Sequence, residues 1–482
     1  MTERRNGASM PTPTAANRGP TPCDLMVVEG YVLTLDDQRR VFPDGAVAIR
    51  GGRIAEVGPT AALRARYTPD ETIDAAGAVV HPGFIDGHYH AGLHLSRGVI
   101  TDNPHPAADE GAGPGVFTRW INALTDEDEH ASALMASVEM VKNGFTGFVE
   151  AATAFEPDAV GSAAEAVGIR CTLADCMIWD IVGGEPMAAD IPRAPCDPGR
   201  AQRLLGQQVQ RNREPDALVR GHIALYGLGS GSEELLHAAK RLADAHGTVF
   251  HQHQNFTPED RAFDADRFGR SPLVHFAEMG VIGPNVVFTH MNALDEAEAE
   301  AVIGSGMAVV WHPGNAMYYG IARTTENRMP ALHRAGASLT FGTDVAKVWA
   351  FGELGFIAYL LTREGGDYLS AEDLLTMFTR GGARAFGAAD ELGSLEPGKR
   401  ADLVIRTNDL PDAQPNADPV RQMMLVSRTK SVDSVIVNGE VVVRQGTLTR
   451  LDEQEVYAKA RASMLRMAGR AGLPVKNARL GP

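Results

Sequence analysis

The sequence predicts an α/β protein: a (β/α)8 TIM-type barrel with a small β-sandwich domain formed from both ends of the chain. Three observations support this prediction. The middle of the chain alternates short apolar strand-like runs with amphipathic helical stretches over about 300 residues. Strand-rich segments flank this middle on both sides. No glycine-rich phosphate-binding motif follows an early strand, so an open nucleotide-binding sheet is not supported.

The two chain ends carry the strand pattern of the small domain. Residues 1–22 are rich in Pro, Thr, Ala and Gly and lack the apolar segment of a signal peptide, so we expect a disordered tail. Over 23–80, Val and Ile recur at near-alternating positions in DLMVVEGYVLTLD and GAVAIRGGRIAEVG. The same pattern returns over 396–450, in GKRADLVIRTND and VDSVIVNGEVVVRQG. We therefore assign 23–80 and 396–450 to one small β domain.

Residues 81–395 are predicted to form the barrel. Apolar runs such as GFTGFVEA, LVRGHIALYGL, TVFHQHQ, NVVFTH and SLTFGTD alternate with helical stretches such as SEELLHAAKRLADAHG. Several of these stretches end in Gly, the residue expected at a helix C-terminus. Repeated βα units favour a closed barrel. Residues 451–482 are predicted to be a C-terminal helix, EQEVYAKARASMLRMAG, followed by a tail.

Composition excludes several classes of protein. The chain has 45 Lys and Arg against 61 Asp and Glu, and the net charge of −16 argues against a nucleic-acid partner. No segment approaches the ~18 apolar residues of a membrane span. The four cysteines are too scattered for a disulfide framework, which fits a reducing compartment. We therefore expect a cytoplasmic protein that acts on a small molecule, without nucleic-acid or membrane partners.

Histidine and aspartate residues stand at the ends of several predicted strands, where a barrel displays its active site. They are His88, His90, His251, His253, His290, His312 and Asp344. His88 and His90 alternate along one strand and so share its inner face, and His251 and His253 do the same on another. Buried imidazoles and carboxylates need polar partners. A shared divalent cation would partner several of them at once.

The order of these motifs resembles that of the amidohydrolase superfamily. HPGFIDGHYH comes first and is followed by HQHQ, THMNALDE, WHPGNAMYYGIARTTENRMPALHRAGASLTFGTDVA and LGSLEPGKRADLVI. The resemblance covers about residues 24–450. It is strongest for the branch that holds triazine chlorohydrolases, cytosine and guanine deaminases, and adenosylhomocysteine-type deaminases.

The resemblance implies a role for each matching position. His88, His90, His253 and Asp344 would bind one divalent metal ion, zinc or iron, with a water in the remaining position. His290 would be the catalytic histidine that polarises the substrate, and Asp344 would also accept the proton of the water. Such an ion makes hydroxide available near neutral pH. Relatives commonly form homo-oligomers, so we expect one here.

Six further residues are assigned to substrate binding. They are Trp179, His251, Asn255, Phe256, Trp311 and His312. The resemblance implies that His312 lies near the substrate or behind the metal ligands. His251 faces inward, where it would bond a ligand or the substrate or serve as a core residue. For each tryptophan, aromatic packing is the alternative to lining the pocket.

Phe256 departs from the family pattern. In the deaminases and chlorohydrolases, a glutamate three residues after the strand-five histidine carries protons to the leaving group. Here that position holds Phe256, which cannot carry a proton. Either a nearby acid, Glu259 or Asp260, reaches back into the site, or both open a helix after Pro258 as solvated acids.

Three functions remain open on the sequence. The first is a metal-dependent hydrolase that cleaves a C–N bond in a cyclic or aromatic small molecule, with Asp344 and His290 handling the protons. The second is a non-deaminating enzyme on the same fold, such as a lyase or an isomerase. The third is a binding protein that has lost catalysis. The complete set of predicted ligands favours an enzyme.

Overall fold

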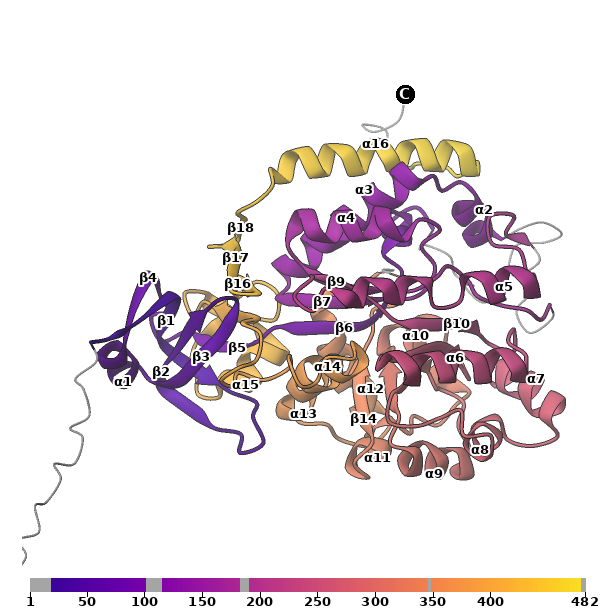
Figure 1. The fold of residues 1–482 in the computed structure, drawn as a ribbon, viewed down its shortest axis with the longest axis horizontal. Coiled ribbons are helices and arrows are strands. Elements are labelled where there is room, and N and C mark those ends of the chain that lie inside the picture. Colours follow the sequence, from indigo (N-terminus) through magenta and orange to yellow (C-terminus); the bar gives the residue numbers. More distant parts are fainter. Residues whose placement is uncertain (1–18, 101–114, 183–189, 346–347, 478–482) are drawn as a thin grey trace, which may run out of the picture.

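The barrel strands run parallel through the middle of the molecule (Figure 1). The structure is a computed structural model that describes residues 19–100, 115–182, 190–345 and 348–477. One parallel sheet contains β6 (Phe84–Tyr89), β7 (Phe145–Glu150), β8 (Arg170–Leu173) and β9 (Val219–Gly221). The other contains β10 (Ile223–Gly227), β11 (Phe250–Gln254), β12 (Val286–His290), β13 (Ala308–Trp311) and β14 (Ser338–Phe341).

These two sheets close into one (β/α)8 barrel. β9 and β10 are separated only by His222, whose backbone N–H donates to the Leu173 carbonyl (2.8 Å). They therefore act as one barrel strand interrupted at a single residue. At the other seam, Tyr89 pairs with Asp344 in a parallel bridge, and the Asp344 N–H donates to the His88 carbonyl (2.9 Å). The first and last barrel strands thus meet beside the predicted metal ligands.

Asp86 strengthens this seam from inside the barrel. Its buried carboxylate accepts hydrogen bonds from the Thr343 N–H (3.1 Å) and hydroxyl (2.5 Å), and from the His88 N–H (3.0 Å). Burial raises the pKa of Asp86 to about 7. Three donors on one carboxylate fix the backbone of both strands immediately before their site residues.

Helices surround the strands and begin and end where the sequence supplies caps. In α6 (Glu233–His246) the Ser232 hydroxyl accepts from the Leu235 N–H, and the helix stops at Gly247 with φ of 60°. The other α-helices that the structure describes between β6 and β15 are α2 (Val116–Asn122), α3 (Asp126–Lys142), α4 (Pro157–Val167), α5 (Pro198–Leu204), α7 (Pro258–Phe268), α8 (Pro272–Glu278), α9 (Glu296–Ser305), α10 (Pro313–Tyr318), α11 (Met329–Arg334), α12 (Leu354–Glu364), α13 (Ala371–Thr376) and α14 (Gly382–Ala385).

The two chain ends share one sheet, as the sequence predicts. In order across that nine-stranded sheet lie β18 (Thr447–Leu448), β17 (Glu440–Arg444), β16 (Val432–Val437), β15 (Leu403–Arg406), β5 (Val79–Pro82), β1 (Thr21–Leu33), β2 (Val41–Arg50) and β3 (Arg53–Pro59), and β4 (Tyr67–Asp74) also pairs with β1. The N- and C-terminal parts join where β5 runs antiparallel to β15. The short helices α1 (Thr60–Arg66) and α15 (Pro419–Arg421) accompany them.

The predicted tail and C-terminal helix are partly described. Residues 1–18 of the predicted tail lie outside the described residues, and Thr21 and Pro22 already belong to β1. The C-terminal helix, α16 (Glu453–Ala471), returns to the barrel and packs on α3 (Figure 1). There the Ser463 hydroxyl donates to Asp128 (2.7 Å). The predicted boundaries of the domains stay a prediction.

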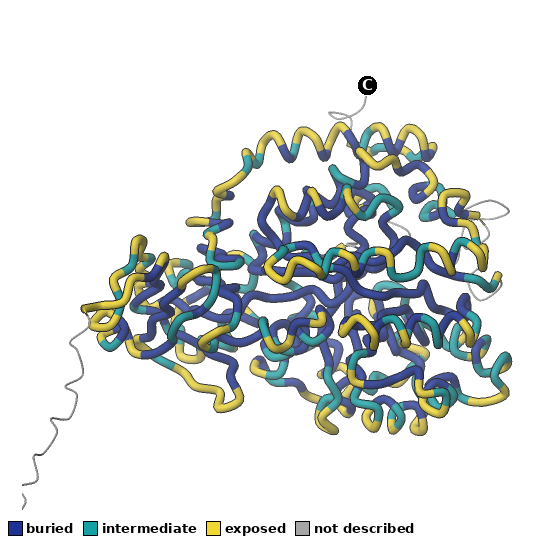
Figure 2. The backbone as a smooth tube through the Cα atoms, viewed as in Figure 1, coloured by how far each residue is buried: buried dark blue, intermediate teal, exposed yellow. Residues whose placement is uncertain are grey.

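Burial follows the layers of the fold. The barrel strands are buried along their length, and exposed residues gather on the outer faces of the helices and at the margins of the sheet (Figure 2). A buried ion pair joins the two parts: Arg170 of β8 donates twice to Asp402, just before β15 (2.8 and 3.0 Å). None of the described helices is long and apolar enough to cross a membrane.

Candidate metal centre and active site

Three predicted ligands converge at the carboxyl ends of the barrel strands. His88 and His90 come from β6 and the residue after it, and His253 comes from β11. One nitrogen from each lies within 4.8 Å of the others, and the two Nε2 atoms of His88 and His90 are 3.3 Å apart. All three side chains are buried. The alternation along each strand brings them together as the sequence predicts.

Hydrogen bonds fix the orientation of two of these rings. The Nδ1 atom of His253 lies 2.7 Å from the Tyr226 carbonyl, which can only accept, so Nδ1 carries the proton and Nε2 does not. The Nδ1 atom of His90 lies 2.7 Å from the Thr153 hydroxyl oxygen. Both rings therefore direct Nε2 toward the centre of the site.

Asp344 completes the set of predicted ligands. Its Oδ1 lies 2.9 Å from His90 Nε2, and its other oxygen accepts a hydrogen bond from the Asn315 side-chain amide. Asp344 has φ of 62°, in the left-handed region that a residue with a side chain rarely adopts. Its backbone bonds to His88 and His90 across the seam hold this conformation.

The electrostatics of the site keep three of its imidazoles neutral. Burial, with a smaller contribution from neighbouring imidazoles, lowers the pKa of His253 to about 3. The same causes hold the pKa values of His88 and His290 well below their ordinary value. Neutral imidazoles have a free lone pair on one nitrogen, which is the form that binds a metal ion.

The donor set fits a divalent cation. Unprotonated nitrogens that face each other inside a protein have no donor between them, and such unpartnered polar atoms are costly. Three imidazole nitrogens and one carboxylate suit zinc and similar ions, which accept nitrogen and oxygen ligands with an open position for water.

His290 lies beside this set at the end of β12. Its ring centroid is 5.4 Å from that of His253, and its φ of 72° is again in the left-handed region. Its Nδ1 atom has no hydrogen-bond partner among the described residues. A buried neutral imidazole with a free nitrogen, next to the metal ligands, can bond a substrate atom or exchange a proton with it.

The site opens into a cavity of about 150 Å³. Its polar lining consists of His90, Thr153, His253, His290 and Asp344, and three aromatic residues, Tyr226, Phe256 and Tyr319, also line it. Its apolar lining consists of Leu93, Phe117, Ile121, Met177, Leu228 and Val345. Among these residues, Asp344 is the one that carries a carboxylate. Away from the predicted metal ligands, the described lining is therefore mainly apolar.

Phe256 occupies the position where the resemblance predicts a glutamate. Its ring packs against His290 and against Tyr319, with centroids 4.4 and 5.6 Å away. The acids that follow it do not reach back. Asp260 forms a capping box with Thr257 at the start of α7, and Glu259 is exposed on the first turn of that helix. The prediction that both acids open a helix is the one the structure supports.

Two predicted substrate residues lie deeper in the barrel and do not line the cavity. His251 stacks beneath His88, with ring centroids 5.0 Å apart. His312 lies 2.7 Å from the Gly342 carbonyl through Nδ1 and also contacts the Thr289 hydroxyl. Both side chains are buried, so they support the histidines of the metal site from the interior of the barrel.

Three other residues assigned to substrate binding also do not line this cavity. Trp179 packs behind Tyr226 and donates to the Ala194 carbonyl (2.9 Å). Trp311 is buried on the outer side of β13, where it packs against Phe341. Asn255 donates to the Ala293 carbonyl (2.8 Å) and thereby fixes the loop after β12.

The structure also reveals contributors that the sequence analysis missed. Thr153 contacts His90, and Glu150, the last residue of β7, accepts the Thr153 hydroxyl proton. Glu150 stands at a strand end, which is the signal that identified the other site residues. Asn315, in the first turn of α10 after β13, donates a hydrogen bond to Asp344.

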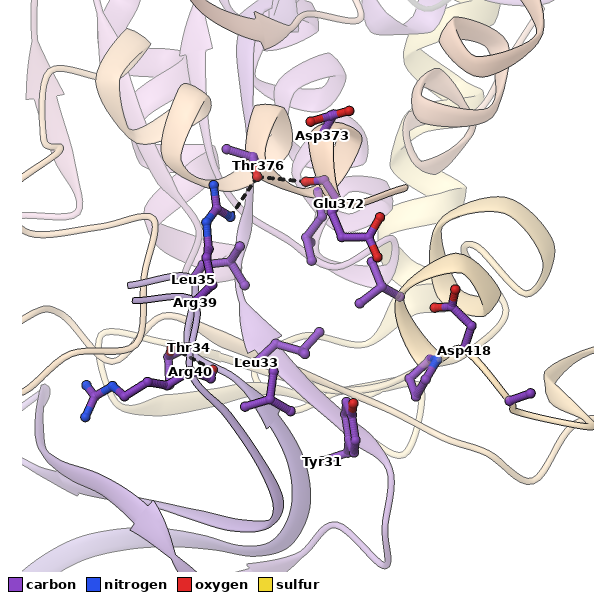
Figure 3. Close-up of a pocket in the computed structure, with 15 residues that line it drawn as sticks. Tyr31, Leu33, Thr34, Leu35, Arg39, Arg40, Glu372, Asp373, Thr376 and Asp418 are labelled. Carbon is purple, nitrogen blue, oxygen red and sulfur yellow. Dashed lines mark hydrogen bonds between the residues drawn. The ribbon is translucent and has the colours of Figure 1, made fainter. Parts of the chain in front are cut away.

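A larger cavity, of about 670 Å³, lies away from this site where β1 faces α13 (Figure 3). None of the predicted site residues lines it. Arg39 donates to the Thr376 hydroxyl (2.9 Å), Arg40 pairs with Asp36, and Asp373 pairs with His333 (3.0 Å). Arg39, Arg40 and Asp373 at its margin thus already have protein partners.

Comparisons with known proteins agree with this geometry. The model of the amidohydrolase family matches residues 79–442, and a model described as an imidazolonepropionase-like composite domain of bacteria matches residues 45–68. A 5-methylthioadenosine/S-adenosylhomocysteine deaminase of Syntrophobacter fumaroxidans is 31% identical over 92% of this chain and 98% of its own. A 5'-deoxyadenosine deaminase of Methanothermobacter thermautotrophicus is 28% identical over 88% of this chain and 95% of its own.

Solved structures show the same fold. A zinc-bound adenosine deaminase from Xanthomonas campestris has a TM-score of 0.81 and 26% identity, covering 93% of this chain and all of its own. An atrazine chlorohydrolase from Arthrobacter aurescens, solved with zinc, has a TM-score of 0.79 and 24% identity, covering 91% of this chain and all of its own.

Proposed function

The chain belongs to the amidohydrolase family and is a metal-dependent hydrolase, and from this premise we propose that it cleaves a C–N bond in a small cyclic or aromatic molecule. The observation that carries the proposal is the convergence of His88, His90, His253 and Asp344 beside His290 at one end of an apolar cavity. We propose zinc as the metal, because the neighbouring adenosine deaminase structure contains it. Iron is the alternative.

The chain's own residues would divide the work as follows. The chemistry supplied by a bound divalent cation is Lewis-acid activation of a water. Asp344 Oδ1, next to the metal-facing nitrogen of His90, is placed to hold the proton that this water releases. His290, with its free Nδ1, is placed to bond the atom of the substrate that becomes electron-rich.

The cavity supports a substrate class. About 150 Å³ is close to the volume of a cavity that holds one benzene-sized ring. Its described lining has side chains such as Leu93, Ile121 and Met177 opposite the histidines, which favours an uncharged, largely apolar ring. The relatives named as deaminases of adenosine derivatives support an attack at an sp² carbon that carries an amino group.

Phe256 favours a second candidate, a reaction that does not release ammonia. An amine is a poor leaving group unless it is protonated, and the described lining of the cavity has no carboxylate besides Asp344 to donate a proton. A lyase, an isomerase or a hydrolase with an anionic leaving group would not need that second acid. Phe256 would then serve only to pack against His290 and exclude water.

Ammonia release tests the proposal directly. The zinc-loaded protein would be incubated with aminated purines, pterins, pyrimidines and triazines, and free ammonia would be measured. We expect release from at least one of these classes. Protein that holds about one metal ion per chain but releases no ammonia from any class would favour the second candidate.

The location and the assembly of the protein stay proposals. We propose that it is cytoplasmic and forms a homo-oligomer with no nucleic-acid or membrane partner. Size-exclusion chromatography with light scattering would test the oligomer.

A further inference from the structure

We propose that Thr153 and Glu150 form a positioning relay that holds His90 in the orientation and protonation form of a metal ligand. The inference rests on the proposed metal site. Neither residue would contact the metal. The loop after β7 would instead support metal binding through His90.

The geometry of the relay fixes the direction of each hydrogen bond. Glu150 accepts from the Thr153 N–H (3.2 and 3.3 Å to its two oxygens) and from the Thr153 hydroxyl (3.2 Å). The ionised carboxylate only accepts, so in this form of Glu150 the Thr153 hydroxyl donates its proton to it. The lone pair of the same hydroxyl then faces His90 Nδ1, 2.7 Å away, and accepts its proton. With the proton on Nδ1, the neutral ring carries its lone pair on Nε2, which points to the other ligands and lies 2.9 Å from Asp344 Oδ1.

The loop that carries Thr153 is anchored on both sides. Ala152 has φ of 61°, a conformation that costs energy for a residue with a side chain, and it immediately precedes Thr153. At the far end, buried Glu129 of α3 accepts from the Phe155 and Glu156 N–H groups (both 2.8 Å). Two buried carboxylates, Glu150 and Glu129, therefore hold the short loop so that the Thr153 hydroxyl is fixed opposite His90.

The other two histidines are supported differently, which makes the relay specific to His90. His253 donates directly to the Tyr226 carbonyl (2.7 Å). His88 Nδ1 has no partner among the described residues. Partners of this kind fix the tautomer and orientation of a ligand, and losing one typically weakens metal binding about 10- to 100-fold.

The test is zinc affinity, measured by chelator competition on the full-length protein. Thr153→Val keeps the shape of the side chain and removes the hydroxyl, and we expect the zinc Kd to rise by about 10-fold or more. Thr153→Ser restores the hydroxyl and should return the Kd close to that of the wild type. The matched control is Thr362→Val, because Thr362 is equally buried and its hydroxyl has no partner among the described residues.

Glu150 is tested through a double-mutant comparison. Glu150→Gln should raise the zinc Kd when Thr153 is present. In the Thr153→Val background the same change should add little, since Glu150 acts through the hydroxyl. Thermal unfolding of the metal-free variants separates this effect from misfolding. The visible absorption of the Co²⁺-loaded protein should change in Thr153→Val and stay unchanged in Thr362→Val.

The outcomes separate the relay from the proposed function. Equal zinc Kd values for the wild type and a folded Thr153→Val variant would overturn the relay and leave the metal site standing. Additive effects of the Glu150 and Thr153 changes would remove Glu150 from the relay. A wild-type protein that binds no zinc, iron, manganese or cobalt would overturn the metal site and the relay together.

Discussion

The phenyl ring of Phe256 lies 4.4 Å from the imidazole of His290, centroid to centroid, with the two rings tilted by 41°. An aromatic ring thus covers the histidine at the position where the resemblance to the amidohydrolases predicts an acid. The contact keeps water away from one side of His290, and it leaves Asp344 as the carboxylate of the described cavity lining. Proton transfer in this enzyme therefore depends on His290 and Asp344.

Restoring the acid should change the reaction. Phe256→Glu is expected to raise ammonia release from the best aminated substrate by about 100-fold, since a positioned acid–base group contributes about 10²- to 10⁴-fold. Phe256→Gln is the control, because it has nearly the same shape as the glutamate and cannot carry a proton. Equal rates for the two variants would show that the carboxylate is not limiting.

Removing the imidazole of His290 should separate catalysis from metal binding. We expect His290→Asn to lower kcat by about 10²-fold or more while the metal content stays near one ion per chain. Metal analysis and turnover would be measured on the same sample. His275→Asn, which changes a distant histidine paired with Glu233, should leave both unchanged. Loss of the metal in His290→Asn would instead identify His290 as a ligand.

Metal removal should abolish activity reversibly. Dialysis against a chelator is expected to release the ion and stop turnover, and added zinc should restore it. His253→Ala removes one of the three converging nitrogens, so this variant should hold little metal after dialysis and should not regain activity at the same zinc concentration. Full activity of the metal-free wild-type protein would contradict the proposed mechanism.

Acid should destabilise the metal-free protein through its buried histidines. Burial lowers the pKa of His222 to about 3, from an ordinary value of 6.5, so between these values the unfolded chain binds a proton that the folded chain does not. The contribution of His222 to the free energy of unfolding is therefore fully present above pH 6.5 and is lost as the pH falls. At pH 5 the loss is about 2 kcal/mol. Chemical denaturation from pH 7 to 5 should show a shallower loss in His222→Gln than in the wild type. Equal losses of stability in the variant and the wild type would contradict the assignment of this effect to His222.

Breaking the ion pair between the barrel and the sheet should lower the stability of the protein more than breaking an exposed pair of similar geometry. Asp402→Asn leaves the buried Arg170 without its charged partner and is expected to cost about 3 kcal/mol, measured as a lower Tm. Asp367→Asn breaks the exposed bidentate pair with Arg334 and should hardly change the Tm. Similar shifts for both variants would show that burial does not set the cost.

Much of the fold could be predicted because its signals are local. Alternation places His88 with His90 and His251 with His253 on the inner faces of their strands, and the apolar runs identify the barrel strands themselves. The return of α16 to α3 was not predicted, because it depends on contacts such as Ser463 with Asp128 between segments far apart in sequence.

The substrate-facing residues were harder to predict. Trp311 and His312 are adjacent at the end of β13, so one must face outward when the other faces inward, and only the packed structure shows Trp311 against Phe341. Trp179 follows a strand in an irregular segment, where no periodicity indicates its direction. Thr153 was missed because its partner, His90, lies on another strand.

The seam between β6 and β14 sets the order in which the enzyme can mature. His88 and His90 leave the ribosome early, and Asp344 leaves only after every other barrel strand has been made. The four predicted ligands cannot meet until the ring has closed, so a nascent or truncated chain has no complete site with which to capture an ion. Binding of a metal ion by all four predicted ligands therefore requires that the whole barrel has been synthesised and folded.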